Sequence, residues 1–169
     1  HKKFSSIFSK FCFSNMQFAK NLAGKTFKNH IELMLRVCGY EYEKQQSITR
    51  GQILDFIYPN INRINDSPSD CIVSECQSTL KDRFRLSLGK IPPSKPIKKY
   101  IFTGSGIGII TKSDTNDITP EKVSEIRDKG WTIVVFDEVK KNKFSKDGAV
   151  ISYENFFNKV YPSLSGLWN

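Results

Sequence analysis

Two carboxylates and one amide lie in short apolar segments that alternate as strands do. Ile53, Asp55 and Ile57 share one face of QILDFIY, and Glu75 and Gln77 share one face of CIVSECQ. Carboxylates on adjacent strands can hold Mg²⁺, which takes one or two of them together with phosphate oxygens and water. Such an ion orients a water for attack on a phosphate, and the Gln77 amide can contact either group. The alternative, two ordinary solvent-facing carboxylates, is disfavoured by the isoleucines beside Asp55.

A run of charge follows within a few positions. The segment KDRFR contains Lys81, Asp82, Arg83 and Arg85 near the start of an expected helix. Lysine and arginine can donate to guanine O6 and N7, and aspartate can accept from cytosine N4. The first three residues therefore carry the groups that read C·G pairs in a major groove. Arg85 is better placed for a phosphate. The alternative is a solvated helix face of a common kind.

The charge of the whole chain points the same way. The 169 residues have a formal net charge of +9, and seven basic residues stand against one acidic residue between positions 77 and 100. Such a field favours a polyanion, and nucleic acid before a membrane because no long apolar run accompanies it. General charge-driven binding and a merely solvated basic face remain alternatives.

The four cysteines do not suggest a metal site. They lack the paired spacing of a zinc cage, and the chain has only two histidines. Three of the cysteines have apolar neighbours, so we expect reduced core residues in an intracellular protein. The glycine-rich segment FTGSGIGII lacks the third glycine of a dinucleotide-binding loop and is predicted to form a turn or a hairpin.

Hydrophobic periodicity predicts a single α/β domain. Helices are expected over 20–38 with Gly39 ending it, from a cap at Ser78 or Thr79 through Leu88, from a Thr119 cap to Gly130, and after residue 152. Strands are expected over 53–58, 71–77, 99–103, 131–136 and 149–151, with a loop over 61–70. Residues 1–19 are expected to form an N-terminal Phe-rich helix or arm. The strand, helix and strand between 99 and 136 predict a right-handed parallel crossover.

In combination these segments resemble one known family. In order along the chain, ILDFIYP, ECQSTLKDRFR, KKYIFT, GWTIVVF and ISYENFF are similar to the catalytic domain of EcoRII-like type II restriction endonucleases, a branch of the PD-(D/E)xK nucleases. The similarity is most specific between residues 77 and 85. It implies an α/β fold with a central mixed β-sheet flanked by helices, in one endonuclease domain over 1–169 whose nuclease core is 20–160.

The resemblance also implies an activity. It implies a homodimer in the prokaryotic cytoplasm that cuts double-stranded DNA with Mg²⁺ at a short palindrome with outer C·G pairs, leaving 5′-phosphate and 3′-hydroxyl ends. Asp55 matches the family's metal-binding aspartate, and Lys81, Asp82 and Arg83 match its base-reading triplet.

The chain departs from the family pattern around the site. Gln77 stands where the family has its catalytic lysine, and Glu75 is acidic where close relatives often are not. In the following helix, where relatives place their second carboxylate, stands Lys90. Near the start of the first helix, where relatives carry another acidic residue, stands Lys28, with Glu32 one turn later.

We therefore predict that the acid and the lysine have exchanged places. Asp55 and Glu75 would hold the metal, and Lys90 would reach in from the helix to supply the positive charge. Gln77 would help to manage the phosphate and the water. Two alternatives stay open: that Gln77 serves without Lys90, or that the site is inactive and the protein is a sequence-specific DNA-binding module on the same fold.

Overall fold

The structure is a computed structural model that describes residues 23–49, 51–81, 84–105 and 117–168. The expected N-terminal helix or arm and most of the glycine-rich segment lie outside these residues. The helical elements are α2 (Ala23–Val37), α3 (Ile61–Asp66), η1 (Pro68–Asp70), α4 (Phe84–Leu88), α5 (Pro120–Asp128), α6 (Asp137–Lys143), α7 (Tyr153–Asn155), η3 (Phe156–Val160) and α8 (Tyr161–Ser165). The strands are β1 (Glu43–Thr49), β2 (Gln52–Tyr58), β3 (Ile72–Gln77), β4 (Lys98–Thr103), β5 (Trp131–Val135) and β6 (Val150–Ser152).

The six strands form one mixed sheet in the order β1-β2-β3-β4-β5-β6. β1, β2 and β3 pair antiparallel, whereas β3, β4, β5 and β6 pair parallel. The parallel strands are joined through α4, α5 and α6, as crossover connections require. The carboxyl ends of β3, β4 and β5 therefore meet at one edge of the sheet, the position where open α/β sheets commonly bind ligands.

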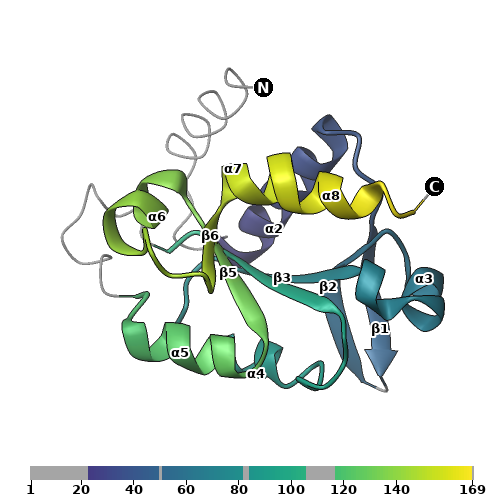
Figure 1. The fold of residues 1–169 in the computed structure, drawn as a ribbon, viewed down its shortest axis with the longest axis horizontal. Coiled ribbons are helices and arrows are strands. Elements are labelled where there is room, and N and C mark those ends of the chain that lie inside the picture. The colour runs from purple at the N-terminus through teal and green to yellow at the C-terminus, as the bar shows by residue number, and fades with distance from the viewer. Residues whose placement is uncertain (1–22, 50, 82–83, 106–116, 169) are drawn as a thin grey trace.

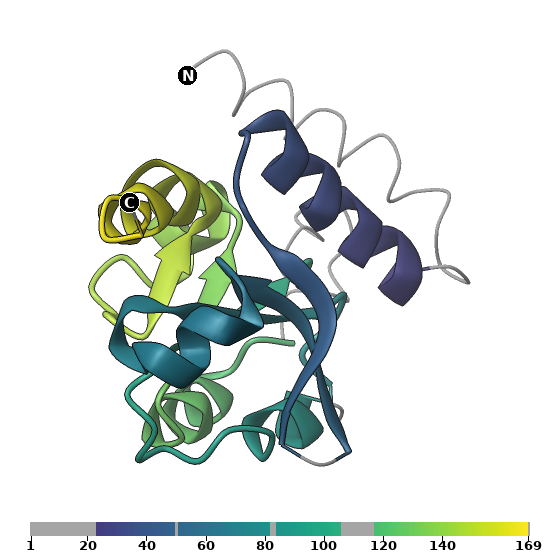
Figure 2. The same ribbon diagram turned by 90° about the vertical axis from the view of Figure 1, so that its right-hand side faces the viewer.

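Helices cover both faces of the sheet. α2 and the C-terminal helices α7 and α8 lie over one face, and α4 and α5 lie over the other (Figures 1 and 2). This arrangement confirms the predicted α/β class with a central mixed sheet flanked by helices. It also gives the site at the end of β3 access to side chains from two layers.

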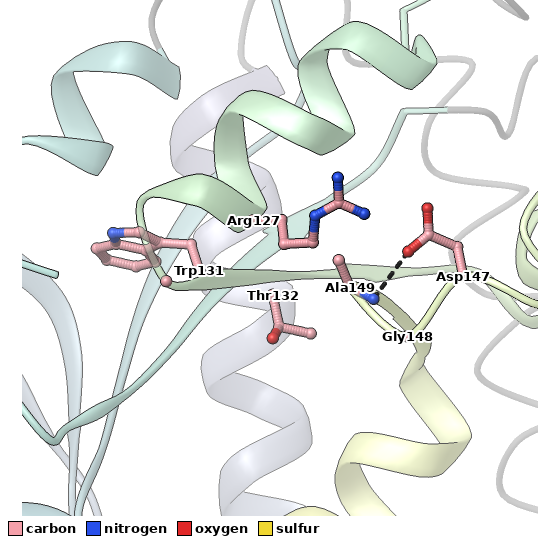
Figure 3. Close-up of a pocket in the computed structure, with 7 residues that line it drawn as sticks. Arg127, Trp131, Thr132, Asp147, Gly148 and Ala149 are labelled. Carbon is pink, nitrogen blue, oxygen red and sulfur yellow. Dashed lines mark hydrogen bonds between the residues drawn. The ribbon is translucent and has the colours of Figure 1, made fainter.

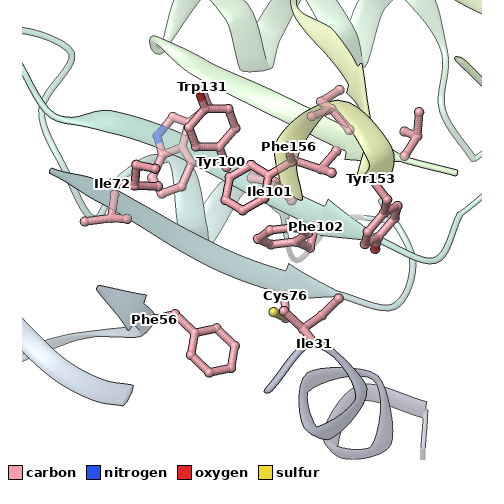
Figure 4. Close-up of a cluster of buried hydrophobic side chains, with 14 of the residues drawn as sticks. Ile31, Phe56, Ile72, Cys76, Tyr100, Ile101, Phe102, Trp131, Tyr153 and Phe156 are labelled. Carbon is pink, nitrogen blue, oxygen red and sulfur yellow. The ribbon is translucent and has the colours of Figure 1, made fainter. Parts of the chain in front are cut away.

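The core follows from strands that are apolar on both faces. Tyr100 and Phe102 of β4 pack edge-on against Phe156 of η3, with ring centroids 5.1 and 4.8 Å apart. Figure 4 shows this cluster with Ile31 of α2 and Cys76 of β3 nearby. Aromatic edge-to-face contacts of this kind add to the free energy gained by burying the rings. The C-terminal helices are thereby fixed on the central strands, as the closing-helix prediction requires.

Several predicted boundaries agree with the structure. α2 ends at Val37, and Gly39 just beyond it has φ +68 and donates its backbone N–H to the Arg36 carbonyl at 3.0 Å. The Thr119 hydroxyl caps α5 by accepting from Lys122, and Gly130 follows the helix with φ +72. β4, α5 and β5 form the expected parallel crossover.

Other expectations were wrong. Residues 61–70 are not a loop, because Asn60 caps α3 by accepting from the Arg63 backbone N–H at 2.9 Å. α4 does not begin after Ser78 or Thr79, since residues 78–81 are irregular. The polar strand β1 was not predicted, because an edge strand with few apolar residues has no clear alternation. α6 was also missed.

Candidate active site

The site lies where β2 and β3 separate. The antiparallel ladder pairs Ile57 with Val73 and Phe56 with Ser74, so the next opposed pair would be Asp55 and Glu75. At this point each carboxylate side chain accepts a hydrogen bond from the backbone of the opposite strand, in place of the backbone–backbone bonds of the ladder. The Asp55 backbone N–H donates to Glu75 Oε1 at 3.2 Å, and the Cys76 backbone N–H donates to Asp55 Oδ2 at 2.8 Å. The fork between the strands thus holds both carboxylates in fixed orientations.

Lys90 reaches this fork from the segment after α4. Its ammonium lies 2.7 Å from Glu75 Oε2 and also donates to the Ile53 carbonyl at 2.6 Å. Lys90 lies two residues beyond the end of α4, not within the helix as expected from the sequence. Ile53 is exposed, so only Ile57 of the two isoleucines that share a face with Asp55 is buried. The contact places Lys90 beside Glu75 as the exchange hypothesis requires, while its catalytic role stays a prediction.

Glu75 is the most buried charged group of the cluster. Its side chain is 2% exposed. Burial, followed by the nearby charge of Asp55, raises the pKa of the Glu75 carboxyl. The hydrogen bond and charge of Lys90 and the hydrogen bond from Ser87 oppose the shift. The net direction is upward. Because the Glu75 carboxylate is almost completely removed from water, its charge depends on the hydrogen-bond donors that surround it.

Gln77 joins the cluster through a serine. Its Nε2 donates to Ser87 Oγ at 3.1 Å, and Ser87 Oγ donates to Glu75 Oε2 at 3.1 Å. Ser87, from α4, was not identified from the sequence. Its spacing from Leu80, Phe84 and Leu88 gave no signal, since a lone serine within a helix is common. Its position shows that α4 contributes to the site directly.

Lys28 comes from the opposite layer. It lies on α2 between Phe27 and Ile31, at the flank of the helix's buried stripe. Its Nζ is 2.5 Å from Asp55 Oδ1 and 6.0 Å from the centroid of the Phe56 ring. Both ends of the carboxylate pair are therefore held by ammonium groups, Lys28 at Asp55 and Lys90 at Glu75.

Glu32, one turn after Lys28, serves a different contact. Its Oε1 accepts from Arg36 at 2.8 Å, Lys44 at 2.9 Å and Tyr42 at 3.2 Å. These donors lower the pKa of the Glu32 carboxyl, and the hydrogen bond from Lys44 makes the largest contribution. Glu32 thus ties α2 to β1 and the turn before it.

The predicted base-reading residues are only partly described. Lys81 is exposed, and Asp82 and Arg83 lie outside the described residues. Arg85 makes a two-pronged ion pair with Glu125 of α5, at 2.8 and 3.0 Å. A phosphate at Arg85 would have to share or replace that partner.

The segment leading into Lys81 is held firmly at Leu80. The Leu80 backbone N–H donates to Asp117 Oδ2 at 2.7 Å and to Ser105 Oγ at 2.9 Å. The Leu80 carbonyl accepts from Lys122 Nζ at 2.6 Å. One residue thus has both backbone polar groups bound by side chains beyond β4, which fixes the chain just before Lys81.

The donor set fits a single hard divalent ion. Within the described residues, no group of three or more histidine, cysteine, aspartate or glutamate side chains could hold a metal. Asp55 and Glu75 do supply two adjacent carboxylates, and Mg²⁺ commonly takes one or two together with water and phosphate oxygens. The chemistry of the pair therefore suits Mg²⁺ better than a metal that needs an all-protein cage.

A shallow hollow lies at the other end of the parallel strands. It is lined by Arg127, Trp131, Thr132, Asp147 and Ala149, among others (Figure 3). Trp131 begins β5, whereas the carboxylate site follows the last residues of β3. In Figure 3 only Asp147 and the Ala149 backbone N–H join by a hydrogen bond. The hollow is not continuous with the carboxylate pair.

Comparison with known proteins decides the family. A family model described as EcoRII C terminal matches residues 2–157. The chain belongs to this family. No curated protein matches. The resemblance to EcoRII-like type II restriction endonucleases is thereby confirmed.

Solved structures of two restriction endonucleases share the fold. Metal-depleted Ecl18kI in complex with uncleaved DNA matches with a TM-score of 0.72 and 19% identity over 94% of this chain and 50% of that chain. A PspGI-substrate DNA complex matches with a TM-score of 0.63 and 18% identity over 98% of this chain and 68% of that chain. This chain therefore spans half the length of Ecl18kI. In the described part of the chain, no helix is both long and apolar enough to cross a membrane.

Proposed function

We propose that the protein is a type II restriction endonuclease that cleaves double-stranded DNA at a specific site with Mg²⁺. The observation that carries this proposal is the fork itself, where Asp55 and Glu75 lie together and Lys90 Nζ is 2.7 Å from Glu75. Family membership supports a nuclease, and the structural neighbours named above are DNA complexes. The same reasoning favours a place in the prokaryotic cytoplasm.

Asp55 and Glu75 are the metal-holding residues of this proposal. Backbone N–H groups fix one oxygen of each, Asp55 Oδ2 and Glu75 Oε1, so the carboxylates need little reorganisation to bind. Mg²⁺ bound there would lower the pKa of a water and neutralise charge developing on the phosphate. The two carboxylates set where on the DNA backbone that chemistry occurs.

Lys90 and Gln77 handle the phosphate and the water. Lys90 brings a positive charge to the place where the family's lysine is missing, and it reaches the same carboxylate that Gln77 reaches through Ser87. A cation here can stabilise the negative charge of the transition state. Gln77 donates hydrogen bonds without charge, which suits orientation of a water or phosphate oxygen.

Lys81, Asp82 and Arg83 are the proposed base readers. Their donor and acceptor groups match C·G pairs, and they precede α4, whose far end leads to Lys90. Arg85 would contact the backbone phosphate. A palindromic site with outer C·G pairs calls for two copies of these residues, so we propose a homodimer whose two-fold axis matches that of the DNA.

Cleavage of plasmid DNA tests the proposal. The wild type should give discrete fragments with Mg²⁺ and none with EDTA, and sequencing the fragment ends should give one palindrome. DNA binding without fragments at any Mg²⁺ concentration would favour the inactive DNA-binding module. A smear without preferred ends would reject sequence specificity.

A lysine swap tests the proposed exchange. Lys90→Ala should abolish cleavage at saturating Mg²⁺ while DNA binding survives, because the catalytic charge is lost. Gln77→Lys added to Lys90→Ala should restore part of the activity by returning a lysine to the family position. Lys98→Ala, an exposed lysine at the start of β4, is the matched control and should cut normally. Undiminished cleavage by Lys90→Ala would contradict the exchange.

A further inference from the structure

The Lys28–Asp55 contact is unusual for a carboxylate expected to bind a dication. Lys28 Nζ lies 2.5 Å from Asp55 Oδ1, and the two side chains are 22% and 21% exposed. The Phe56 ring centroid lies 6.0 Å from the ammonium, within the range of a cation–π contact. The two residues are 27 positions apart, so no local sequence pattern pairs them.

All four carboxylate oxygens of the pair already accept a hydrogen bond. Asp55 Oδ2 and Glu75 Oε1 accept from backbone N–H groups, which belong to the strands and stay in place. Asp55 Oδ1 accepts from Lys28, and Glu75 Oε2 accepts from Lys90 and Ser87. Two formal negative charges are thus balanced by two formal positive charges. A divalent ion approaching Asp55 meets the Lys28 ammonium at the outer oxygen.

Lys28 and Lys90 differ in what holds them. Lys90 also donates to the Ile53 carbonyl, which ties it to β2. Lys28 has Asp55 as its hydrogen-bond partner and only the Phe56 ring as a further contact among those described above. The Lys28 ammonium lies at the end of a flexible side chain on a separate helix, so it can move away from Asp55 without disturbing the strands.

We propose that Lys28 is a built-in counter-cation of the metal site, a proposal that rests on the function proposed above. In the metal-free protein Lys28 neutralises Asp55 and keeps the carboxylate in its binding orientation. When a divalent ion binds, the ammonium must leave Oδ1, and its charge opposes the ion from nearby. Lys28 therefore weakens divalent-ion binding at the site.

Metal titration without DNA tests this proposal. Mn²⁺ is titrated into the DNA-free protein and the free ion is followed by electron paramagnetic resonance. Lys28→Met should tighten Mn²⁺ binding by about tenfold or more, because a unit charge within a few ångströms of a dication is removed from a partly buried site. Lys28→Arg keeps the charge and should stay within about threefold of the wild type. Lys25 is an exposed lysine one turn earlier on α2, so Lys25→Met is the matched control. Its Mn²⁺ affinity should also stay within about threefold of the wild type.

A stability measurement gives a second readout. Metal-free Lys28→Met should melt at a lower temperature than the wild type, since Asp55 loses its counter-charge. Mn²⁺ should raise the melting temperature of this variant by more than it raises that of the wild type. If Lys28→Met does not fold, Lys28→Gln replaces it, because glutamine is neutral but can still donate to Asp55. Mn²⁺ affinity equal to or weaker than the wild type in a folded neutral variant would overturn the proposal.

One further variant separates this proposal from the proposed function. Asp55→Asn added to Lys28→Met should abolish the tightened Mn²⁺ binding. If Mn²⁺ binding is unaffected by Asp55→Asn, the metal site itself is wrong. If Asp55→Asn abolishes binding but Lys28→Met binds Mn²⁺ as the wild type does, the metal site stands and only the role of Lys28 is refuted.

Discussion

Removing the Lys90 charge should expose the energetic cost of the buried Glu75 carboxylate. In Lys90→Met the Glu75 side chain, 2% exposed, keeps only Ser87 and the Asp55 backbone N–H as hydrogen-bond donors. Breaking a buried ion pair by removing one partner typically costs ~3–5 kcal/mol. Lys90 is 23% exposed, so solvent screens part of the interaction and we expect the low end, about 3 kcal/mol.

The loss should depend on pH in a definite direction. The folded-state pKa of Glu75 is raised already, and loss of Lys90 raises it further. A carboxyl with a raised pKa disfavours folding above that pKa, and the penalty is relieved as the group takes up a proton at lower pH. The destabilisation by Lys90→Met should therefore be largest at neutral pH and shrink as the pH falls through the raised Glu75 pKa.

Denaturant unfolding at neutral and mildly acidic pH measures this effect. In thermal unfolding of a chain of this size, a loss of ~3 kcal/mol should lower the melting temperature by roughly 6–12 °C. The double variant Glu75→Gln/Lys90→Met should recover much of the loss, because no buried charge remains. Lys98→Met is the exposed-lysine control. A loss below ~1 kcal/mol that is the same at both pH values, or a double variant no more stable than Lys90→Met, would refute the reasoning.

Three further predictions concern the segment around the proposed base readers. Asp117→Ala removes an acceptor from the Leu80 backbone N–H and from Ser105, and should cost about 1–3 kcal/mol in urea unfolding; no measurable loss would mean that the contact is dispensable. Glu125→Ala frees Arg85 from its exposed ion pair and should tighten DNA binding while changing stability by less than ~1 kcal/mol. Arg85→Ala should weaken binding and reduce the salt slope by about one unit, and an unchanged slope would argue against a phosphate contact.

Prediction from sequence succeeded where local pattern controls structure. β3 coincides with the short apolar run CIVSECQ and is buried from Ile72 to Cys76, and α5 follows its Thr119 cap, its proline and the closing Gly130. It failed where tertiary context selects the element. β1 forms because it pairs with β2, although its own residues are mostly polar, and α3 depends on a single Asn60 cap within a segment rich in turn-forming residues.

The candidate site divides in the same way. Asp55, Glu75 and Gln77 could be named from the sequence because period-two alternation places their side chains on defined strand faces. Ser87 could not, since its value comes from lying between Gln77 and Glu75.

The sequence by itself determined the family, the α/β class and the two carboxylates, because short-range alternation and a charged segment of specific order carry that information. Only the tertiary structure decided which cation each carboxylate meets. Lys28 and Lys90 reach Asp55 and Glu75 across 27 and 15 positions from helical layers on opposite faces of the sheet. No local pattern encodes that meeting, since it depends on how α2 and α4 pack on the fork between β2 and β3.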